Sequence, residues 1–315
     1  MRTRSIGSLE ASVVGLGCNN FGRRLDQAAT DAVVGAALDA GVTLLDTADI
    51  YGGTLSETYL GRVLKGRREE AVVATKFGHP SRDDDLVGAR PETVRAALEA
   101  SLRRLAMDHV DLYQLHMPDP SVPIDETLGA LGEAIDAGLV REIGCSNFSA
   151  EQLQEAEEAA DQHGLPRFVS VQNEYSLLHR APEAEVLPWC EREGVAFLPY
   201  FPLLSGILTG KYRRGEALPE GARVTGHERW RALLTDDVYD VVERLSAFAE
   251  ARGRELIDLA FAYLLGRRPV ASVIAGATTP DQVRRNVAAG AWVLGEEELT
   301  EVTAILDDAG VEIER

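Results

Sequence analysis

Short apolar runs alternate with helix-forming segments along most of this 315-residue chain, and this alternation limits the possible folds more than any other feature. Eight of the apolar runs read as strands of a parallel sheet, because strands covered on both faces are nearly continuously apolar. The runs are 14–17, 43–45, 71–75, 110–116, 140–146, 168–172, 195–200 and 272–275. Eight strand–helix units close most naturally into a (β/α)8 TIM barrel, which is the α/β fold that we predict.

Three further features complete the predicted architecture. Residues 3–6 and 9–14 flank Gly7 and Ser8 and predict an N-terminal β-hairpin. The stretch 203–236, after the seventh strand, is too long for an ordinary connection and is expected to form a loop excursion over the barrel mouth. We expect one domain over residues 1–315.

Apolar positions at helical spacing predict the intervening helices. The bounded ones are 31–40, 56–65, 185–193, 238–251, 256–265 and 297–307. Pro91 suits the first turn of another helix, and capping-box patterns open helices after Ser149 and after Thr279. The rival architecture is an open doubly wound sheet, but no GxGxxG pattern follows the first strand, so a Rossmann fold is disfavoured.

Composition narrows the class of partners. A formal charge of −19 argues against nucleic acid and against anionic membranes. The cysteines Cys18, Cys145 and Cys190 have neither a CxxC spacing nor a matching histidine pattern, so no metal site is predicted. The polar N-terminus lacks the apolar segment of a secretion signal, and a cytoplasmic monomer or homo-oligomer is expected.

Three successive predicted strands end in an acid, an amine and an imidazole, and the first loop adds a phenol. These residues are Asp46, Lys76, His116 and, within GVTLLDTADIYGG (41–53), Tyr51. In a barrel, side chains at strand C-termini face the active site. A nearby ammonium lowers the pKa of a phenol from about 10, so Lys76, held charged by Asp46, is expected to tune Tyr51 as a general acid. His116 is expected to hydrogen-bond the substrate oxygen or to relay a proton.

Each of these residues alone has a structural explanation. Asp46 suits a turn cap, Tyr51 a half-buried loop aromatic, Lys76 a solvated strand end and His116 a buried structural histidine. Their positions in consecutive units at one rim favour a shared chemical role. A second chemical interpretation stays open, in which Lys76 is a Schiff-base nucleophile, as in aldolases.

Several stretches together resemble the aldo-keto reductase superfamily over almost the whole chain. They are GVTLLDTADIYG (41–52), ATK (74–76), DLYQLH (111–116), GCSNF (144–148) and VQNEYS (171–176). The segment YFPLLSGILTGK (200–211) looks most like the branch that contains bacterial sugar-type reductases and potassium-channel beta subunits. The resemblance implies a catalytic tetrad of Asp46, Tyr51, Lys76 and His116, and an NADP-type cofactor across the barrel mouth.

The resemblance also implies the contacts of cofactor and substrate. Ser146, Asn147 and Gln172 would meet the nicotinamide carboxamide, since amide and hydroxyl groups both donate and accept hydrogen bonds. Tyr200 would stack on the nicotinamide ring. The full set of implied cofactor contacts is Gly17, Cys18, Asn19, Asp46, Ser146, Asn147, Gln172, Tyr200, Phe201, Pro202, Leu203, Ser205, Lys211, Arg223, Gly276, Thr278, Gln282, Arg285 and Asn286. The expected substrate contacts are Phe21, Tyr51, Phe77, His116 and Met117, with Arg24 and Trp230 as further wall residues.

The segment SVIAGATTPDQVRRN (272–286) is similar to the adenosine-phosphate segment of the family, with one departure. Its strand–loop–helix order points a helix N-terminus at an anion, where free N–H groups favour it. Many relatives carry lysine or arginine at the positions of Gly276, Thr278 or Gln282. Here Arg285 is the candidate to contribute that charge, and NADP(H) is predicted, with NAD(H) as the alternative.

The sequence therefore predicts an NADP-dependent oxidoreductase that reversibly reduces a small-molecule aldehyde or ketone to the alcohol, with Tyr51 as general acid/base. The pattern does not select one carbonyl substrate. The alternative function is a nucleotide-binding regulatory subunit, like the channel partners, with slow secondary reductase activity.

Overall fold

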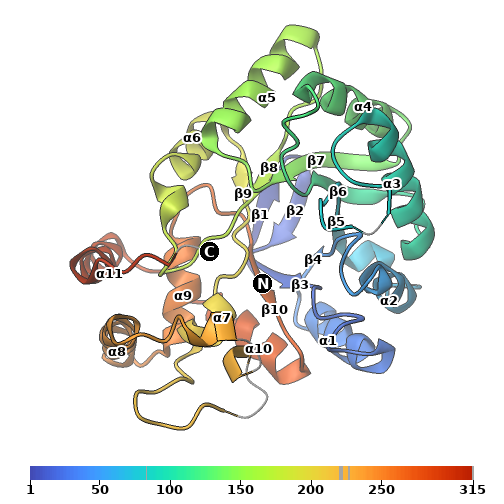
Figure 1. Cartoon of the computed structure of the whole chain (residues 1–315). Coiled ribbons are helices and arrows are strands. Elements are labelled where there is room, and N and C mark those ends of the chain that lie inside the picture. The colour runs from blue at the N-terminus through green and yellow to red at the C-terminus, as the bar shows by residue number, and fades with distance from the viewer. Residues whose placement is uncertain (83, 220–222, 226–227, 314–315) are drawn as a thin grey trace.

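The computed structural model describes residues 1–82, 84–219, 223–225 and 228–313 (Figure 1). Among these residues, eight parallel strands form one sheet in the order β10-β3-β4-β5-β6-β7-β8-β9. Backbone hydrogen bonds from Phe197 N to Pro269 O (2.7 Å) and from Ile274 N to Pro199 O (3.0 Å) join the two sheet edges into a ring. The strands are β3 Val14–Gly17, β4 Leu44–Asp46, β5 Val72–Phe77, β6 Val110–Leu115, β7 Val140–Ser146, β8 Ser170–Gln172, β9 Ala196–Phe197 and β10 Val273–Gly276. The predicted (β/α)8 barrel is confirmed.

Helices surround the ring, and they alternate with the strands as predicted (Figure 1). They are α1 Gln27–Asp39, α2 Leu55–Val63, α3 Pro91–Leu105, α4 Ile124–Asp136, α5 Ala150–His163, α6 Val186–Glu193, α7 Glu228–Arg231, α8 Asp236–Glu250, α9 Leu256–Leu265, α10 Pro280–Ala289 and α11 Glu296–Ala309. No helix in the described part of the chain is long and apolar enough to cross a membrane.

One predicted strand is much shorter than expected. The run 195–200 contributes only Ala196–Phe197 to the sheet, because Pro199 has no N–H group to give to a ladder. The excursion 203–236 contains only short helical turns among its described residues: η3 Leu204–Thr209, η4 Arg223–Thr225 and α7.

The predicted N-terminal hairpin closes the bottom of the barrel. Strands β1 Thr3–Ile6 and β2 Leu9–Ser12 pair antiparallel through a turn at Gly7, whose φ of 56° suits glycine. Its apolar side chains join an inner cluster contributed by the strands, which consists of Ile6, Leu9, Ala11, Leu44, Ala74, Leu112, Ala196, Leu198, Ala271 and Ile274. The interior is therefore packed at this end.

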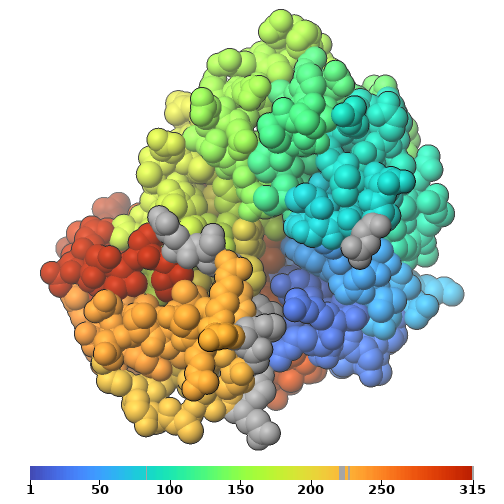
Figure 2. All heavy atoms as spheres, viewed as in Figure 1, coloured from blue at the N-terminus to red at the C-terminus, as the bar shows by residue number. Residues whose placement is uncertain are grey.

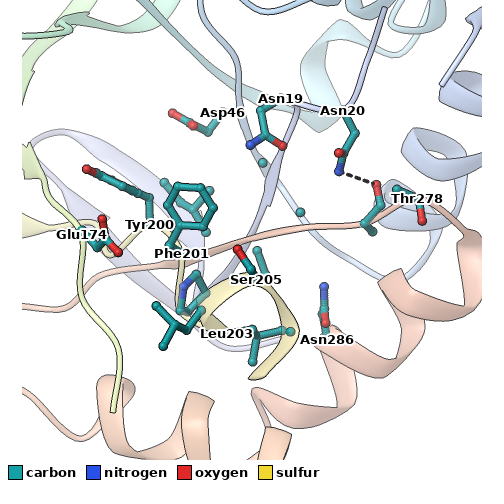
Figure 3. A pocket seen from close by; sticks show the side chains of 18 of the residues that line it. Asn19, Asn20, Asp46, Glu174, Tyr200, Phe201, Leu203, Ser205, Thr278 and Asn286 are labelled. Carbon is teal, nitrogen blue, oxygen red and sulfur yellow. Dashed lines mark hydrogen bonds between the residues drawn. The ribbon is translucent and has the colours of Figure 1, made fainter. Parts of the chain in front are cut away.

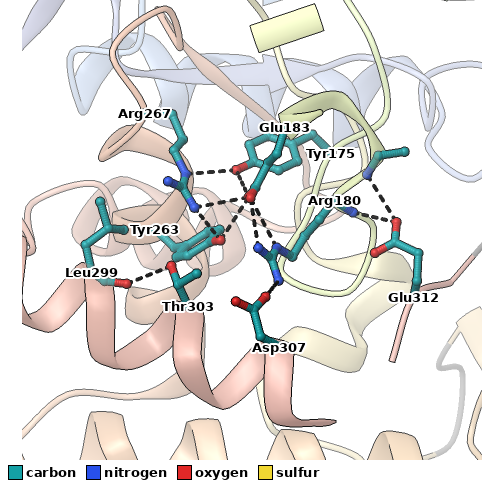
Figure 4. A network of polar contacts seen from close by, with 10 residues as sticks. Tyr175, Arg180, Glu183, Tyr263, Arg267, Leu299, Thr303, Asp307 and Glu312 are labelled. Atoms are coloured by element: carbon teal, nitrogen blue, oxygen red, sulfur yellow. Dashed lines mark hydrogen bonds and ion pairs between the residues drawn. The ribbon is translucent and has the colours of Figure 1, made fainter. Parts of the chain in front are cut away.

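The C-terminal segment is anchored by a polar network around Glu183, which lies in the short turn η2 Ala181–Glu183 (Figure 4). One carboxylate oxygen accepts hydrogen bonds from Tyr175 (2.6 Å) and Tyr263 (2.8 Å), and the other accepts from Arg180 (3.0 Å). Arg180 also contacts Asp307 of α11 at 2.7 Å. The network ties α9 and α11 to the segment that follows β8.

Candidate active site

Asp46 and Lys76 form a buried ion pair at the ends of neighbouring strands β4 and β5. The Lys76 ammonium lies 2.7 and 2.8 Å from the two carboxylate oxygens and gives a third hydrogen bond, of 2.9 Å, to the carbonyl of Thr47. Gln172 donates to the same carboxylate at 2.8 Å. Both side chains are almost fully buried, and each charge is neutralised by the other, as burial requires.

The phenol of Tyr51 lies directly beside this pair. Its ring centre is 5.2 Å from the Lys76 nitrogen. Burial raises the pKa of Tyr51 above its ordinary value, and although the Lys76 charge and hydrogen bond oppose this effect, they do not outweigh it. The expectation that Lys76 lowers the pKa of Tyr51 below its ordinary value is therefore wrong. The effect of desolvation exceeds the stabilisation of the phenolate by the ammonium. Lys76 itself has a raised pKa: burial lowers it, but Asp46 and Tyr51 favour the charged form more strongly.

The loop that carries Tyr51 is fixed by close backbone contacts. Asp49 N donates to the carbonyl of Lys76 at 3.2 Å. Gly52 has a φ of 59°, and a Cβ atom there would lie 2.3 Å from the carbonyl oxygen of Phe21, so only glycine fits this approach. The buried Asp49 carboxylate pairs with Arg82 at 2.7 Å. Burial nonetheless raises the pKa of Asp49 to about 7.

His116, one residue after β6, completes the group at the rim. Its ring lies edge-on to Tyr51 at 6.0 Å between centres, and to His79 at 4.7 Å. Burial, with the nearby Lys76 charge, holds the pKa of His116 well below its ordinary value, so the imidazole is neutral. Its Nδ1 is buried and has no hydrogen-bond partner among the described residues. A neutral imidazole with an unused nitrogen can bind a polar group in the adjoining cavity.

The polar groups at the ends of β7 and β8 bond mainly to one another. Ser146 donates to the carbonyl of Gln172 at 2.6 Å, and Asn147 donates to the carbonyl of His116 at 2.9 Å. The Tyr200 hydroxyl donates to the Asn147 amide oxygen at 2.8 Å. These contacts fix the orientation of the amide groups beside Tyr51 and His116.

A cavity of about 1020 Å³ runs from Tyr51 and His116 to α10. Figure 3 shows part of its wall, between Asp46 and Asn286. Most predicted site residues line it: Gly17, Asn19, Asp46, Tyr51, His116, Met117, Ser146, Asn147, Gln172, Tyr200, Phe201, Pro202, Leu203, Ser205, Lys211, Gly276, Thr278, Gln282, Arg285 and Asn286, and Arg24 does as well. A second hollow of about 490 Å³, lined by Arg23, Ile50, Gly53 and His79, also reaches Tyr51 and His116. In Figure 2 the surface is hollowed between the orange segment that contains α7 and the blue N-terminal part.

Four predicted contacts do not reach the cavity. Cys18, Phe21 and Phe77 are fully buried, and Phe77 stacks on Tyr113 at 4.6 Å between ring centres. In a strand, successive side chains point to opposite faces, so Phe77 points away from the barrel interior into which Lys76 points. Trp230 packs against Phe201 and is not part of the wall. The side chain of Arg223 lies outside the described residues.

Sequence reasoning missed several wall residues. His79 follows Phe77 by two positions, and its place just after a predicted strand could have marked it as a wall residue. Glu174, Arg229 and Glu255 also line the cavity. No pattern in the sequence marks Glu255, which caps the start of α9.

The far part of the cavity contains a buried polar group without a partner among the described residues. Ser205 has a φ of 56° within a left-handed turn, and its buried hydroxyl, which lines the cavity, has no hydrogen-bond partner among the described residues (Figure 3). Beyond it, Thr279 caps α10, and its hydroxyl accepts a hydrogen bond from Gln282 N at 3.2 Å. Gln282 does not complete the predicted capping box, because its side chain accepts from Thr278 N at 2.8 Å. An anion in the cavity would give the Ser205 hydroxyl the partner that it lacks.

Three kinds of comparison place this geometry among known proteins. The sequence model of the Aldo/keto reductase family matches residues 13–307. The chain is 36% identical to Protein tas of Escherichia coli (strain K12), with 95% of each chain covered. It is 34% identical to a probable voltage-gated potassium channel subunit beta of Arabidopsis thaliana, with 92% of this chain and 91% of the relative covered. The solved structure of a glycerol dehydrogenase from Gluconobacter oxydans matches with a TM-score of 0.85 and 30% identity, covering 99% of this chain and 97% of that one.

Proposed function

The chain belongs to the aldo/keto reductase family, and we propose that it reversibly reduces an aldehyde or ketone to the alcohol with NADPH as hydride donor. The observation that carries the proposal is the position of Tyr51, between the buried Asp46–Lys76 pair and the neutral His116, at one end of a large cavity.

Tyr51 is the group that we propose transfers the proton. A bound reduced nicotinamide would supply the hydride to the carbonyl carbon. The Tyr51 hydroxyl gives its proton to the substrate oxygen as that oxygen gains negative charge, and Lys76 stabilises the phenolate that forms. Because burial raises the pKa of the resting phenol, Tyr51 keeps its proton until the substrate oxygen gains charge. In the reverse direction the same phenolate takes the proton from the alcohol.

The neighbours of Tyr51 hold and orient the reacting groups. Asp46 keeps Lys76 charged and fixes its direction through two short contacts. We propose that neutral His116 donates a hydrogen bond to the carbonyl oxygen and so aims it at Tyr51. A raised Lys76 pKa disfavours the Schiff-base alternative, since only a neutral amine attacks a carbonyl carbon.

The residues that would hold the dinucleotide follow the cavity away from Tyr51. Ser146, Asn147 and Gln172 would face the carboxamide, and Tyr200 the nicotinamide ring. Ser205 and Lys211 would meet the pyrophosphate. Thr278, Gln282 and Asn286, with the start of α10, would hold the adenosine end.

The test is a panel of aldehydes and ketones, including sugars and aromatic carbonyls, with NADPH or NADH, followed by loss of reduced-cofactor absorbance. The proposal expects turnover with at least one class of carbonyl compound. The similarity to a potassium channel beta subunit supports the second candidate, a nucleotide-binding regulatory subunit. Tight NADPH binding without turnover on any carbonyl would favour that candidate. A cytoplasmic location, a monomeric or homo-oligomeric state and a single domain over residues 1–315 stay predictions.

A further inference from the structure

Arg285 and Glu255 form an ion pair in the wall of the cavity, at the end far from Tyr51. The Arg285 guanidinium contacts Glu255 at 2.9 and 3.2 Å and Asp258 at 2.6 Å. Burial would raise the pKa of Asp258, but hydrogen bonds from Arg285 and from Glu255 N hold it below its ordinary value, so this carboxyl is ionised. The single Arg285 guanidinium therefore pairs with two carboxylates at once.

This cluster lies beside the residues implied at the adenosine end. Gln282 precedes Arg285 by three positions in α10, so the two side chains share one face of the helix. Gly276, Thr278 and Gln282, which line the same part of the cavity, are uncharged. Arg284, the other arginine of α10, pairs with Asp281 and does not line the cavity. Both arginines of α10 are thus already paired with carboxylates.

The two nicotinamide dinucleotides differ at the adenosine ribose. NADPH carries a 2′-phosphate, which a free arginine would stabilise. NADH carries a 2′-hydroxyl instead, and this hydroxyl can donate a hydrogen bond to a carboxylate. A doubly charged phosphate within a Debye length of about 8 Å of the Glu255 carboxylate is repelled by it. The Glu255 side chain is 72% exposed, so this repulsion is moderate rather than prohibitive.

We propose that Glu255 sets the choice of cofactor: by holding Arg285 in an ion pair and adding a carboxylate at the adenosine end, it removes the usual advantage of NADPH, so the protein binds NADH with comparable affinity. This inference rests on the proposed dinucleotide site. It makes Glu255 a specificity-determining residue that acts at a distance from the proton-transfer chemistry.

The experiment measures dissociation constants of NADPH and NADH by calorimetry for the purified full chain. The wild type is expected to bind the two within about fivefold of one another. Glu255→Gln is expected to tighten NADPH binding by about three- to tenfold and to change NADH binding by less than about twofold, because an exposed charge interaction contributes about 1 kcal/mol. Glu255→Ser, which places a residue favoured at helix N-caps at the start of α9, should have the same effect.

Three further measurements test whether the change in NADPH affinity comes from the Glu255 charge and its pair with Arg285. The gain in NADPH affinity should shrink at high salt. It should also be smaller when Glu255→Gln is made in an Arg285→Gln background, because only the direct repulsion between Glu255 and the phosphate is then removed. Glu297→Gln, which removes an exposed carboxylate outside the cavity wall, should leave the affinity ratio unchanged.

A wild type that prefers NADPH by more than about a hundredfold would overturn the inference while leaving the reductase proposal intact. An unchanged ratio in Glu255→Gln, or a gain that is just as large without Arg285, would do the same. If neither dinucleotide binds, the inference and the proposed function fail together.

Discussion

The Lys76 ammonium contacts both carboxylate oxygens of Asp46, at 2.7 and 2.8 Å, across two neighbouring strands of the barrel. Two buried charges are stable only together, so this pair fixes the direction of Lys76 and keeps it charged beside Tyr51. The proposed chemistry depends on that arrangement.

Asp46→Asn tests the pair. Removing one partner leaves an uncompensated buried ammonium, so the free energy of unfolding should fall by about 3–5 kcal/mol. Turnover should fall at least about a hundredfold, since Lys76 loses both its charge partner and its orientation. Denaturant unfolding and kcat measure the two effects. Asp39→Asn, which breaks a pair in which Asp39 is 72% exposed, should change stability by less than about 1 kcal/mol.

Gly52→Ala tests the contact that positions the Tyr51 loop. The added Cβ would lie 2.3 Å from the carbonyl oxygen of Phe21, so the loop must move and kcat should fall about tenfold or more. Gly53→Ala is a matched control, because Gly53 has a similar φ of 61° but nothing within 4 Å of the new atom. It should lower stability by about 1 kcal/mol and leave kcat nearly unchanged. Equal activity of the two variants would contradict this account of the loop.

Ser205→Ala separates stability from binding. The Ser205 hydroxyl is buried without a partner among the described residues, so removing it should leave the free protein as stable or more stable by up to about 1 kcal/mol. NADPH affinity should fall about tenfold, because the hydroxyl is proposed to meet the pyrophosphate. Ser170→Ala removes another such buried hydroxyl, outside the cavity wall, and should not change affinity. Calorimetric titration and thermal unfolding of both variants provide the comparison.

Glu183→Gln tests the C-terminal network and its pH dependence. Burial alone would raise the pKa of Glu183, but hydrogen bonds from Arg180 and Tyr175, with the Arg267 charge, hold it below 4.5. A lowered pKa means that the carboxylate stabilises the fold fully above pH 4.5 and loses this effect as the pH falls through the folded value. The variant should therefore be about 1–3 kcal/mol less stable at pH 7 and should approach the wild type in acid.

Unfolding curves across pH measure this difference. Glu191→Gln, whose partner Arg268 is 85% exposed, should cause a loss of less than about 1 kcal/mol at any pH. A Glu183→Gln difference that stays constant from pH 7 into acid would contradict the assigned pKa shift.

The barrel and the group at its rim could be predicted from the sequence, because parallel strands bring their C-terminal residues to one edge. Asp46, Lys76 and His116 follow from that rule alone. Phe77 could not be placed correctly, because one position along a strand reverses the direction of the side chain, and the predicted boundaries did not resolve that step. The raised Tyr51 pKa was missed for a related reason: the sequence names the charged neighbours of a group but not the depth of its burial.

The end of the cavity where we propose that the adenosine binds was the least predictable part. Arg285 was recognised as a charge near the expected phosphate, but its ion pairs depend on Glu255 and Asp258, which lie about one helix earlier in the chain. Only the packing of α9 against α10 brings these residues together. Glu255 carries no motif, so its place in the cavity wall appears only in three dimensions.

The most direct test of the central claim is Tyr51→Phe, assayed for NADPH binding and for carbonyl turnover in the same preparation. We expect the dissociation constant for NADPH to stay within about threefold of the wild type, since the ring is kept, and kcat to fall at least about a thousandfold, since only the proton-transferring hydroxyl is lost. Turnover close to that of the wild type, with NADPH still bound, would contradict the role of Tyr51.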